Sequence, residues 1–94
     1  MLKTLENLIN IIRDRKSSSD DSSYTSKLLK DKSLSVEKVK EEIGELIEAV
    51  ENNSNKVHEA ADVLYHLLVY LEGNGVRIED IMHELEKRNK KKES

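Results

Sequence analysis

The stretch HEAADVLYHLLVYL, from His58 to Leu71, decides how this chain folds. Its Ala, Val, Leu and Tyr residues cover nearly all sides of a helix, and a helix that is apolar almost all round is a buried one. Asp62 lies inside this window, with Glu59 and His66 close by. A buried carboxylate is costly without a partner. The stretch therefore predicts a buried central helix on which Asp62 either faces water or has its charge compensated.

Three further segments of the chain show apolar residues at helical spacing. Ser35 has the character of an N-cap for a second long helix, and Ser54 or Asn55 can cap the central one. The segment YTSKLLK is expected to form only a short helical turn. The sequence shows no sustained alternation of apolar and polar residues, so an all-α fold of four helices is predicted, in which the two long helices form an antiparallel hairpin. The expected helices cover about residues 2–15, 35–50, 55–72 and 77–88.

Length and composition fit one small domain that spans residues 1–94. The net charge of −3 argues weakly against a general nucleic-acid binder, and the absence of cysteine excludes thiolate metal sites. The N-terminus has no long apolar region typical of a signal peptide, and the apolar run from Ala60 to Leu71 is too short and too polar to span a membrane, so a cytoplasmic location is expected. A homodimer is also expected, because packing two copies into a bundle would cover the apolar central helix. Residues 17–23 are predicted to be a mobile loop, and residues 89–94 a charged tail.

Acidic residues repeat at helical spacing on both central helices. Glu42 and Glu45 are three residues apart, so their carboxylates can converge, and Glu59 and Asp62 repeat this spacing. Glu41 lies farther from the apolar stripe of its helix. A Glu-rich segment taken alone is more often a solvated face, but the joint pattern E-x-x-E, thirteen residues, E-x-x-D is more specific. It predicts a Mg²⁺ site, because Mg²⁺ prefers carboxylate oxygens.

Three segments of this chain together resemble a known family. SYTSKLL (Ser23 to Leu29), KVKEEIGELIEA (Lys38 to Ala49) and EAADVLYHLLVYL (Glu59 to Leu71) are similar to phosphoribosyl-ATP pyrophosphatase, which belongs to the MazG-like all-α pyrophosphohydrolases. The paired acidic motifs are shared across that superfamily, whereas SYT-x-x-LL and EAAD-x-x-YHLLV are typical of the histidine-pathway branch. The resemblance covers nearly the whole chain. Lys40 replaces a glycine that is usual in the family, which leaves the carboxylates intact.

The resemblance implies an activity and a cofactor. The expected reaction is hydrolysis of phosphoribosyl-ATP to phosphoribosyl-AMP and pyrophosphate in histidine biosynthesis, by metal-assisted attack of water. The resemblance implies Mg²⁺ held by Glu42, Glu45, Glu59 and Asp62. Glu41 is expected to be an extra ligand or the base that activates water. The expected catalytic carboxylates are therefore Glu41, Glu42 and Glu45.

The phosphates of such a substrate also need cations and hydrogen-bond donors. His66 has two interpretations, either as a residue that meets the ligand or as a core histidine bonded to Asp62 or to the backbone. Two other functions stay open: a MazG-like pyrophosphohydrolase for another nucleotide, and a non-catalytic dimerising adaptor whose acidic face is merely solvated. The expected substrate-binding residues are Ser23, Tyr24, Thr25, Lys27, Lys38, Arg13 and His66, with Arg15 as a further candidate.

Overall fold

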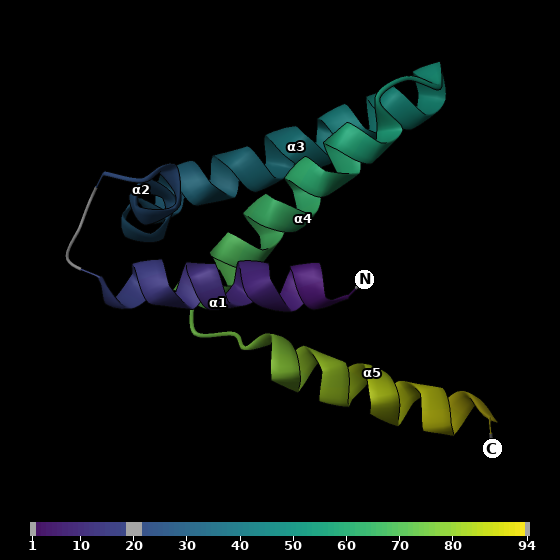
Figure 1. Ribbon diagram of the computed structural model, residues 1–94. Coiled ribbons are helices and arrows are strands. Elements are labelled where there is room, and N and C mark those ends of the chain that lie inside the picture. Colours follow the sequence, from purple (N-terminus) through teal and green to yellow (C-terminus); the bar gives the residue numbers. More distant parts are fainter. Residues whose placement is uncertain (1, 19–21, 94) are drawn as a thin grey trace.

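The structure is a computed structural model that describes residues 2–18 and 22–93, with side chains up to Asn89. These residues contain no strand, and the predicted all-α fold is confirmed. None of the helices found in them is long and apolar enough to cross a membrane. The helices are α1 (Lys3–Ser17), α2 (Tyr24–Lys30), α3 (Lys32–Asn52), α4 (Lys56–Gly73) and α5 (Ile78–Glu93) (Figure 1).

The helices α3 and α4 form the predicted antiparallel hairpin and make the most extensive contact in the fold (Figure 1). The turn between them holds Asn53 and Asn55 at φ values of 54° and 52°. Asparagine tolerates this left-handed conformation better than most residues, so the Asn-rich segment reverses the chain at little cost. Helix α4 begins after Asn55, as expected, although the Asn55 side chain makes no capping hydrogen bond.

Two helix starts differ from the prediction. The segment YTSKLLK forms a complete helix, because the Ser23 hydroxyl accepts a hydrogen bond from a backbone N–H of the first turn at 3.0 Å. Helix α3 begins three residues before Ser35, because Asp31 Oδ1 accepts a hydrogen bond from the backbone N–H of Leu34 at 3.1 Å. Ser35 consequently lies inside α3 and is buried. The described residues thus form five helices, one more than predicted.

The predicted mobile loop and the predicted charged tail lie only partly within the described residues. Ser17 still belongs to α1, and residues 19–21 of the expected loop at 17–23 lie outside the described residues. Helix α5 runs on to Glu93 rather than ending at Arg88. Its last turns are rich in Lys and Glu, which are good helix formers. Ser94 and the side chains from residue 90 onward lie outside the described part of the chain.

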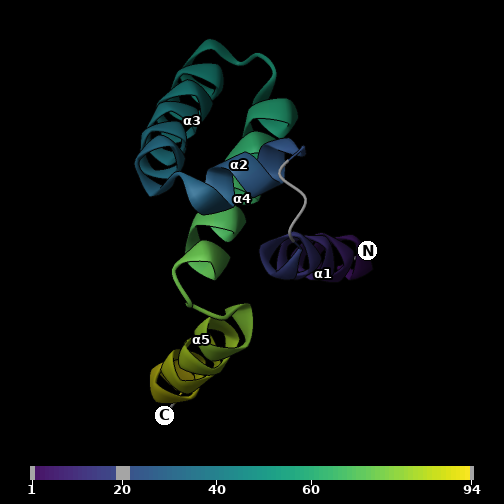
Figure 2. The same cartoon turned by 90° about the vertical axis from the view of Figure 1, so that its left-hand side faces the viewer.

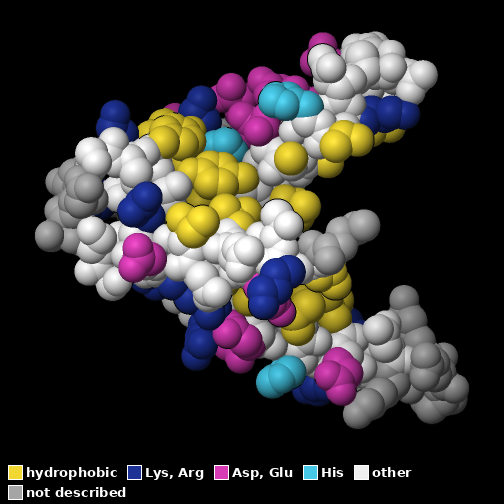
Figure 3. Space-filling view, in the orientation of Figure 1, with side chains coloured by type: hydrophobic (Ala, Val, Ile, Leu, Met, Phe, Trp, Pro, Cys, Tyr) yellow, Lys and Arg dark blue, Asp and Glu magenta, His cyan; other side chains and the backbone are white. Residues whose placement is uncertain are grey.

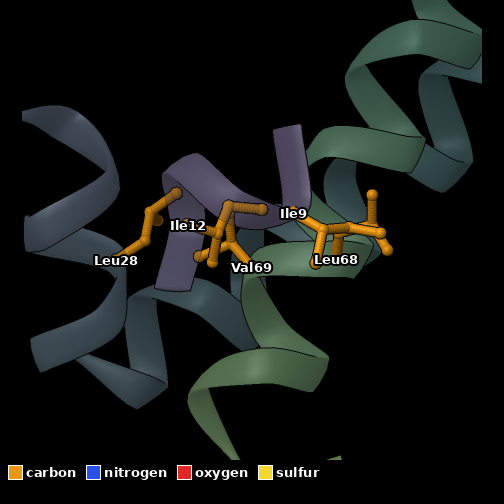
Figure 4. Close-up of a cluster of buried hydrophobic side chains, with 5 residues drawn as sticks. All are labelled: Ile9, Ile12, Leu28, Leu68 and Val69. Atoms are coloured by element: carbon orange, nitrogen blue, oxygen red, sulfur yellow. The ribbon is translucent and has the colours of Figure 1, made fainter. Parts of the chain in front are cut away.

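The hydrophobic core lies at the C-terminal half of α4. It consists of side chains from α1, α2 and α4, and α2 contacts α1, α3 and α4 (Figure 2). Towards the turn of the hairpin the apolar residues are less covered, since Leu64 is 52% exposed and Val57 is 85% exposed. The core therefore anchors one end of the hairpin and leaves the other end projecting. The buried residues of the core are Ile9, Ile12, Leu28, Leu68 and Val69 (Figure 4).

Arg13 ties α1 to α4 and α5 through two carboxylates. Its Nε and Nη2 each lie 2.9 Å from an oxygen of Glu72, and its Nη1 and Nη2 lie 3.0 and 2.6 Å from the oxygens of Glu79. Glu72 is only 4% exposed, and the hydrogen bonds from Arg13 lower its pKa. The same guanidinium lowers the pKa of the exposed Glu79 to about 2. These three residues, the Arg13 clamp, hold the C-terminal end of α4 against α1.

Candidate active site

Carboxylates from α3 and α4 meet across the hairpin. Glu42 and Glu45 of α3 and Glu59 of α4 each place a carboxylate oxygen within 4.8 Å of the other two. Asp62, one turn beyond Glu59, belongs to a second such group that shares Glu59 and also contains His58. The structure therefore brings three of the four predicted metal ligands into one group and places the fourth, Asp62, beside Glu59. Below, the acidic cluster means Glu42, Glu45, Glu59 and Asp62.

Helical spacing and the antiparallel hairpin explain how these side chains converge. Residues three apart on a helix share a face, so each helix contributes one pair of carboxylates. The hairpin then sets the pair on α3 against the pair on α4. In the space-filling view, acidic and histidine side chains gather on one edge of this hairpin, above a band of hydrophobic side chains (Figure 3).

The acidic cluster is electrostatically unfavourable without a cation. Glu42 is 9% exposed, and the Oε2 atoms of Glu42 and Glu59 are buried without a hydrogen-bond partner. Burial raises the pKa of Glu42, and the neighbouring Glu45 raises it further. Burial and Glu45 raise the pKa of Glu59 as well. Unpartnered buried carboxylates are costly, so this donor set fits a hard divalent cation, which binds such oxygens.

Glu41, the third predicted catalytic carboxylate, lies on a different side of α3. Its side chain is 51% exposed, and its Oε2 lies 3.6 Å from Lys38 Nζ. The charge of Glu41 raises the pKa of Lys38, and Lys38 in turn tends to lower the pKa of Tyr24, which burial raises overall. The charges of Glu41 and Lys38 both act on Tyr24, so these two residues lie near α2. The structure does not include Glu41 in either group of converging ligand atoms.

In the SYT segment (Ser23 to Thr25), the side chains of Tyr24 and Thr25 contact α4. The Tyr24 hydroxyl lies 3.1 Å from His66 Nε2, and Thr25 Oγ1 is hydrogen-bonded to the hydroxyl of Tyr65. His66 Nδ1 lies 2.9 Å from the backbone oxygen of Asp62. A carbonyl oxygen only accepts, so Nδ1 carries a proton and donates to the backbone oxygen of Asp62. A chain of hydrogen bonds thus runs from α2 to the backbone of a cluster residue.

His66 is buried, and it bonds to the backbone of Asp62 rather than to its carboxylate. It is enclosed by the rings of Tyr24 and Tyr65, whose centroids lie 5.8 and 5.0 Å from that of the imidazole. This geometry matches the interpretation of His66 as a core histidine bonded to the backbone. Tyr65, the partner of Thr25, was not predicted. The only indication of its role in the sequence is its position directly before His66 in the motif EAAD-x-x-YHLLV.

The predicted cations are spread over the molecule. Lys38 lies beside the SYT segment, and Lys27 is exposed on α2. Arg13 belongs to the Arg13 clamp, and its partner Glu72 is thirteen residues beyond Glu59 on α4, roughly 20 Å along the helix at 1.5 Å per residue. The structure therefore does not bring Arg13 to the acidic cluster. Arg15 is exposed on α1.

Comparison with known proteins identifies the family. The family described as Phosphoribosyl-ATP pyrophosphohydrolase matches residues 5–89. The chain belongs to this family. A phosphoribosyl-ATP pyrophosphatase of Methylobacterium nodulans is 46% identical over 93 residues, which cover 90% of this chain and 82% of the relative. One of Methanosarcina acetivorans is 42% identical over 95 residues, covering 96% and 91%.

Some relatives in the phosphoribosyl-ATP pyrophosphohydrolase family are longer. A histidine biosynthesis bifunctional protein of Thermotoga maritima is 42% identical over 86 residues, which cover 88% of this chain but 44% of that protein. No solved structure matches the chain. The family predicted from the sequence is confirmed, and with it the predicted class of enzyme, a hydrolase of a phosphoric anhydride bond.

Proposed function

We propose that the chain hydrolyses phosphoribosyl-ATP to phosphoribosyl-AMP and pyrophosphate, as a step of histidine biosynthesis. Relatives named phosphoribosyl-ATP pyrophosphatase match nearly the whole chain at 40–46% identity. The observation that carries the proposal is the acidic cluster, in which carboxylates from two helices converge and one oxygen of Glu42 is buried without a hydrogen-bond partner. Such a cluster is suited to a substrate whose phosphates arrive with a divalent cation.

The proposed cofactor is Mg²⁺, held by Glu42, Glu45, Glu59 and Asp62. When bound, the ion neutralises phosphate charge and lowers the pKa of a bound water, the nucleophile for the α–β linkage. Glu41 is the proposed base for that water, because it is exposed and lies towards α2 rather than among the converging ligand atoms. Lys38 would neutralise phosphate charge at the same side of the site. The hydroxyls of Tyr24 and Thr25 would position the substrate there.

The comparisons do not favour the alternative of another nucleotide substrate. Pyrophosphate release measured on phosphoribosyl-ATP and, separately, on ATP and dCTP tests the choice directly. The expected result is a kcat/KM for phosphoribosyl-ATP at least about 100-fold higher than for either plain nucleotide, and no release in EDTA. A plain nucleotide hydrolysed as well as phosphoribosyl-ATP would overturn the proposed substrate. A chain that releases no pyrophosphate from any of them would support the non-catalytic adaptor instead.

We also propose that the chain works as a homodimer that packs through the α3–α4 hairpin. Ile43, Ile47 and Val50 repeat at helical spacing on α3 and are 41%, 54% and 56% exposed, and Leu64 of α4 is 52% exposed. Such a stripe is typical of a helix that packs against another helix. The space-filling view shows hydrophobic side chains along the side of the hairpin that faces the open space above α1 (Figure 3). A second copy would bring an identical stripe to this surface.

A charge in the hydrophobic stripe is expected to dissociate the dimer. Ile47→Glu places a carboxylate at the centre of the proposed interface, where it would be buried without a partner. Light scattering after size-exclusion chromatography is expected to give about half the native mass for this variant. Leu85→Glu is the matched control, since Leu85 is 46% exposed but lies on α5, outside the proposed interface. A native mass for Ile47→Glu, or a halved mass for both variants, would contradict the assignment of the interface.

A further inference from the structure

His58 stands beside the acidic cluster and has no role in the proposed reaction. Its Nε2 lies 3.3 Å from Asp62 Oδ2, and His58, Glu59 and Asp62 place their ligand atoms within 4.8 Å of one another. The histidine side chain is 72% exposed, so ions in solution reach it freely. His58 and Asp62 are four residues apart, which places them on the same face of α4.

The distance between His58 and Asp62 matches two ligands of one metal ion. With metal–ligand bonds of about 2.1 Å, neighbouring ligand atoms are separated by about 3.0 Å in octahedral and about 3.4 Å in tetrahedral coordination. The observed 3.3 Å falls within this interval. A histidine and a second ligand four residues apart on one helix is also the spacing found in helical zinc sites. The pair therefore has the geometry of one edge of a coordination polyhedron.

A second observation points to a cation at this place. Glu59 belongs to both groups of converging ligand atoms, and its Oε2 is buried without a hydrogen-bond partner. Glu42, which converges with Glu59 from the facing helix, is more than nine-tenths buried and carries another unpartnered oxygen. An ordinary surface ion pair between His58 and Asp62 would leave both of these oxygens without a partner. A metal ion held by His58, Glu59 and Asp62 would give the oxygen of Glu59 a partner.

We propose that His58, Glu59 and Asp62 bind a transition-metal ion of the Mn²⁺, Co²⁺ or Zn²⁺ class. Mg²⁺ selects oxygen ligands, whereas imidazole nitrogen is a good ligand for first-row transition metals. His58 thus gives the acidic cluster a nitrogen donor, which raises its affinity for these metals relative to Mg²⁺. The inference rests on the metal-binding part of the proposed function and is independent of which nucleotide is hydrolysed.

Titration of the metal-free chain with Co²⁺ alone tests this inference. Nitrogen ligation is followed by the visible absorption of bound Co²⁺, and affinities for Co²⁺ and Mg²⁺ are measured by calorimetry. For His58→Gln we expect Co²⁺ affinity to fall by about 10-fold or more and the visible spectrum to change, while Mg²⁺ affinity changes less than about 2-fold. His83→Gln is the matched control, because His83 is an exposed histidine on α5, and it is expected to bind Co²⁺ like the native chain.

Co²⁺ affinity and spectrum that stay native in His58→Gln would overturn the inference. Equal losses of Co²⁺ and Mg²⁺ affinity would overturn it too, because the nitrogen would then confer no preference. Far-UV circular dichroism of the variant separates a loss of the site from a loss of the fold. The outcome is separable from the proposed reaction: His58-dependent Co²⁺ binding in a chain that does not hydrolyse phosphoribosyl-ATP would refute the proposed substrate and leave this inference standing.

Discussion

Replacing Glu42 by Gln is expected to abolish Mg²⁺-dependent pyrophosphate release and, at the same time, to stabilise the metal-free chain. Glu42 is nearly buried, one of its oxygens lacks a partner, and Glu45 and Glu59 lie close to it. The isosteric amide removes the charge but keeps the volume, and its NH₂ group can donate to the neighbouring carboxylates. The charge of Glu42 therefore destabilises the metal-free chain, although the proposed metal site requires it.

The two effects differ in sign, so they are measured separately. Loss of a ligand is expected to lower kcat/KM by about 100-fold or more. Removal of the unpartnered charge is expected to raise the free energy of unfolding by about 1 kcal/mol, a gain of about 4–8 °C in Tm for a domain of this size. Because the folded-state pKa of Glu42 is raised above its ordinary value, its ionised form destabilises the fold. The gain should therefore be absent below the ordinary value, grow as the pH rises from that value to the raised folded-state pKa, and stay constant above it.

Glu48→Gln is the matched control for Glu42→Gln. Glu48 is an exposed glutamate of the same helix and belongs to neither group of converging ligand atoms. It should change neither activity nor Tm appreciably. Mg²⁺ is expected to raise the Tm of the native chain and of Glu48→Gln, but much less that of Glu42→Gln. Native activity in Glu42→Gln would show that Glu42 is not a required metal ligand, and a lower Tm would show that its charge does not destabilise the metal-free chain.

The hairpin and its acidic cluster were predictable because their determinants are local. Apolar residues at helical spacing set the faces of α3 and α4, and the Asn-rich turn sets their antiparallel order. Carboxylates three residues apart then converge wherever two such helices pack. The spacing of four residues between His58 and Asp62 is a local pattern of the same kind, although His58 was not among the predicted site residues.

The starts of α2 and α3 and the placement of Arg13 were harder to predict, for different reasons. Asp31 and Ser35 are both good caps, and the sequence alone does not say which one the chain uses. Arg13 was expected to bind phosphate because the phosphates of the expected substrate need cations. Its partners Glu72 and Glu79 are 59 and 66 residues away along the chain, so only the packing of α1 against α4 and α5 reveals them.

Replacing Arg13 by Met is expected to destabilise the chain strongly, although the Arg13 side chain is partly exposed. It leaves the carboxylate of Glu72 buried without its cation, and breaking a buried pair on one side costs about 3–5 kcal/mol. Because the Arg13 side chain is 29% exposed, water can reach part of the site, and we expect a loss of about 2–3 kcal/mol. For a domain of this size that is roughly 10–20 °C in Tm, measured by thermal unfolding.

The Arg13 clamp also predicts how the stability of the fold depends on pH in acid. Arg13 lowers the pKa of Glu72 and brings that of Glu79 to about 2, against an ordinary value of 4.5. A group with a lowered folded-state pKa stabilises the fold fully above its ordinary pKa, and this stabilisation is lost as the pH falls towards the folded-state value. The native chain should therefore lose stability between about pH 4.5 and 2. Arg13→Met should lack this component.

The double variant Arg13→Met with Glu72→Met separates an unpaired charge from lost packing. Replacing both partners of a buried pair by apolar residues is often nearly neutral, so the double variant is expected to regain most of the stability that Arg13→Met loses. Arg88→Met is the matched control, since Arg88 pairs with Glu84 on α5 and both side chains are more than half exposed. Such surface pairs contribute little, so its Tm should stay within a few degrees of native. If the double variant were as unstable as Arg13→Met, the clamp would act through the volume and contacts of Arg13 and not through its charge.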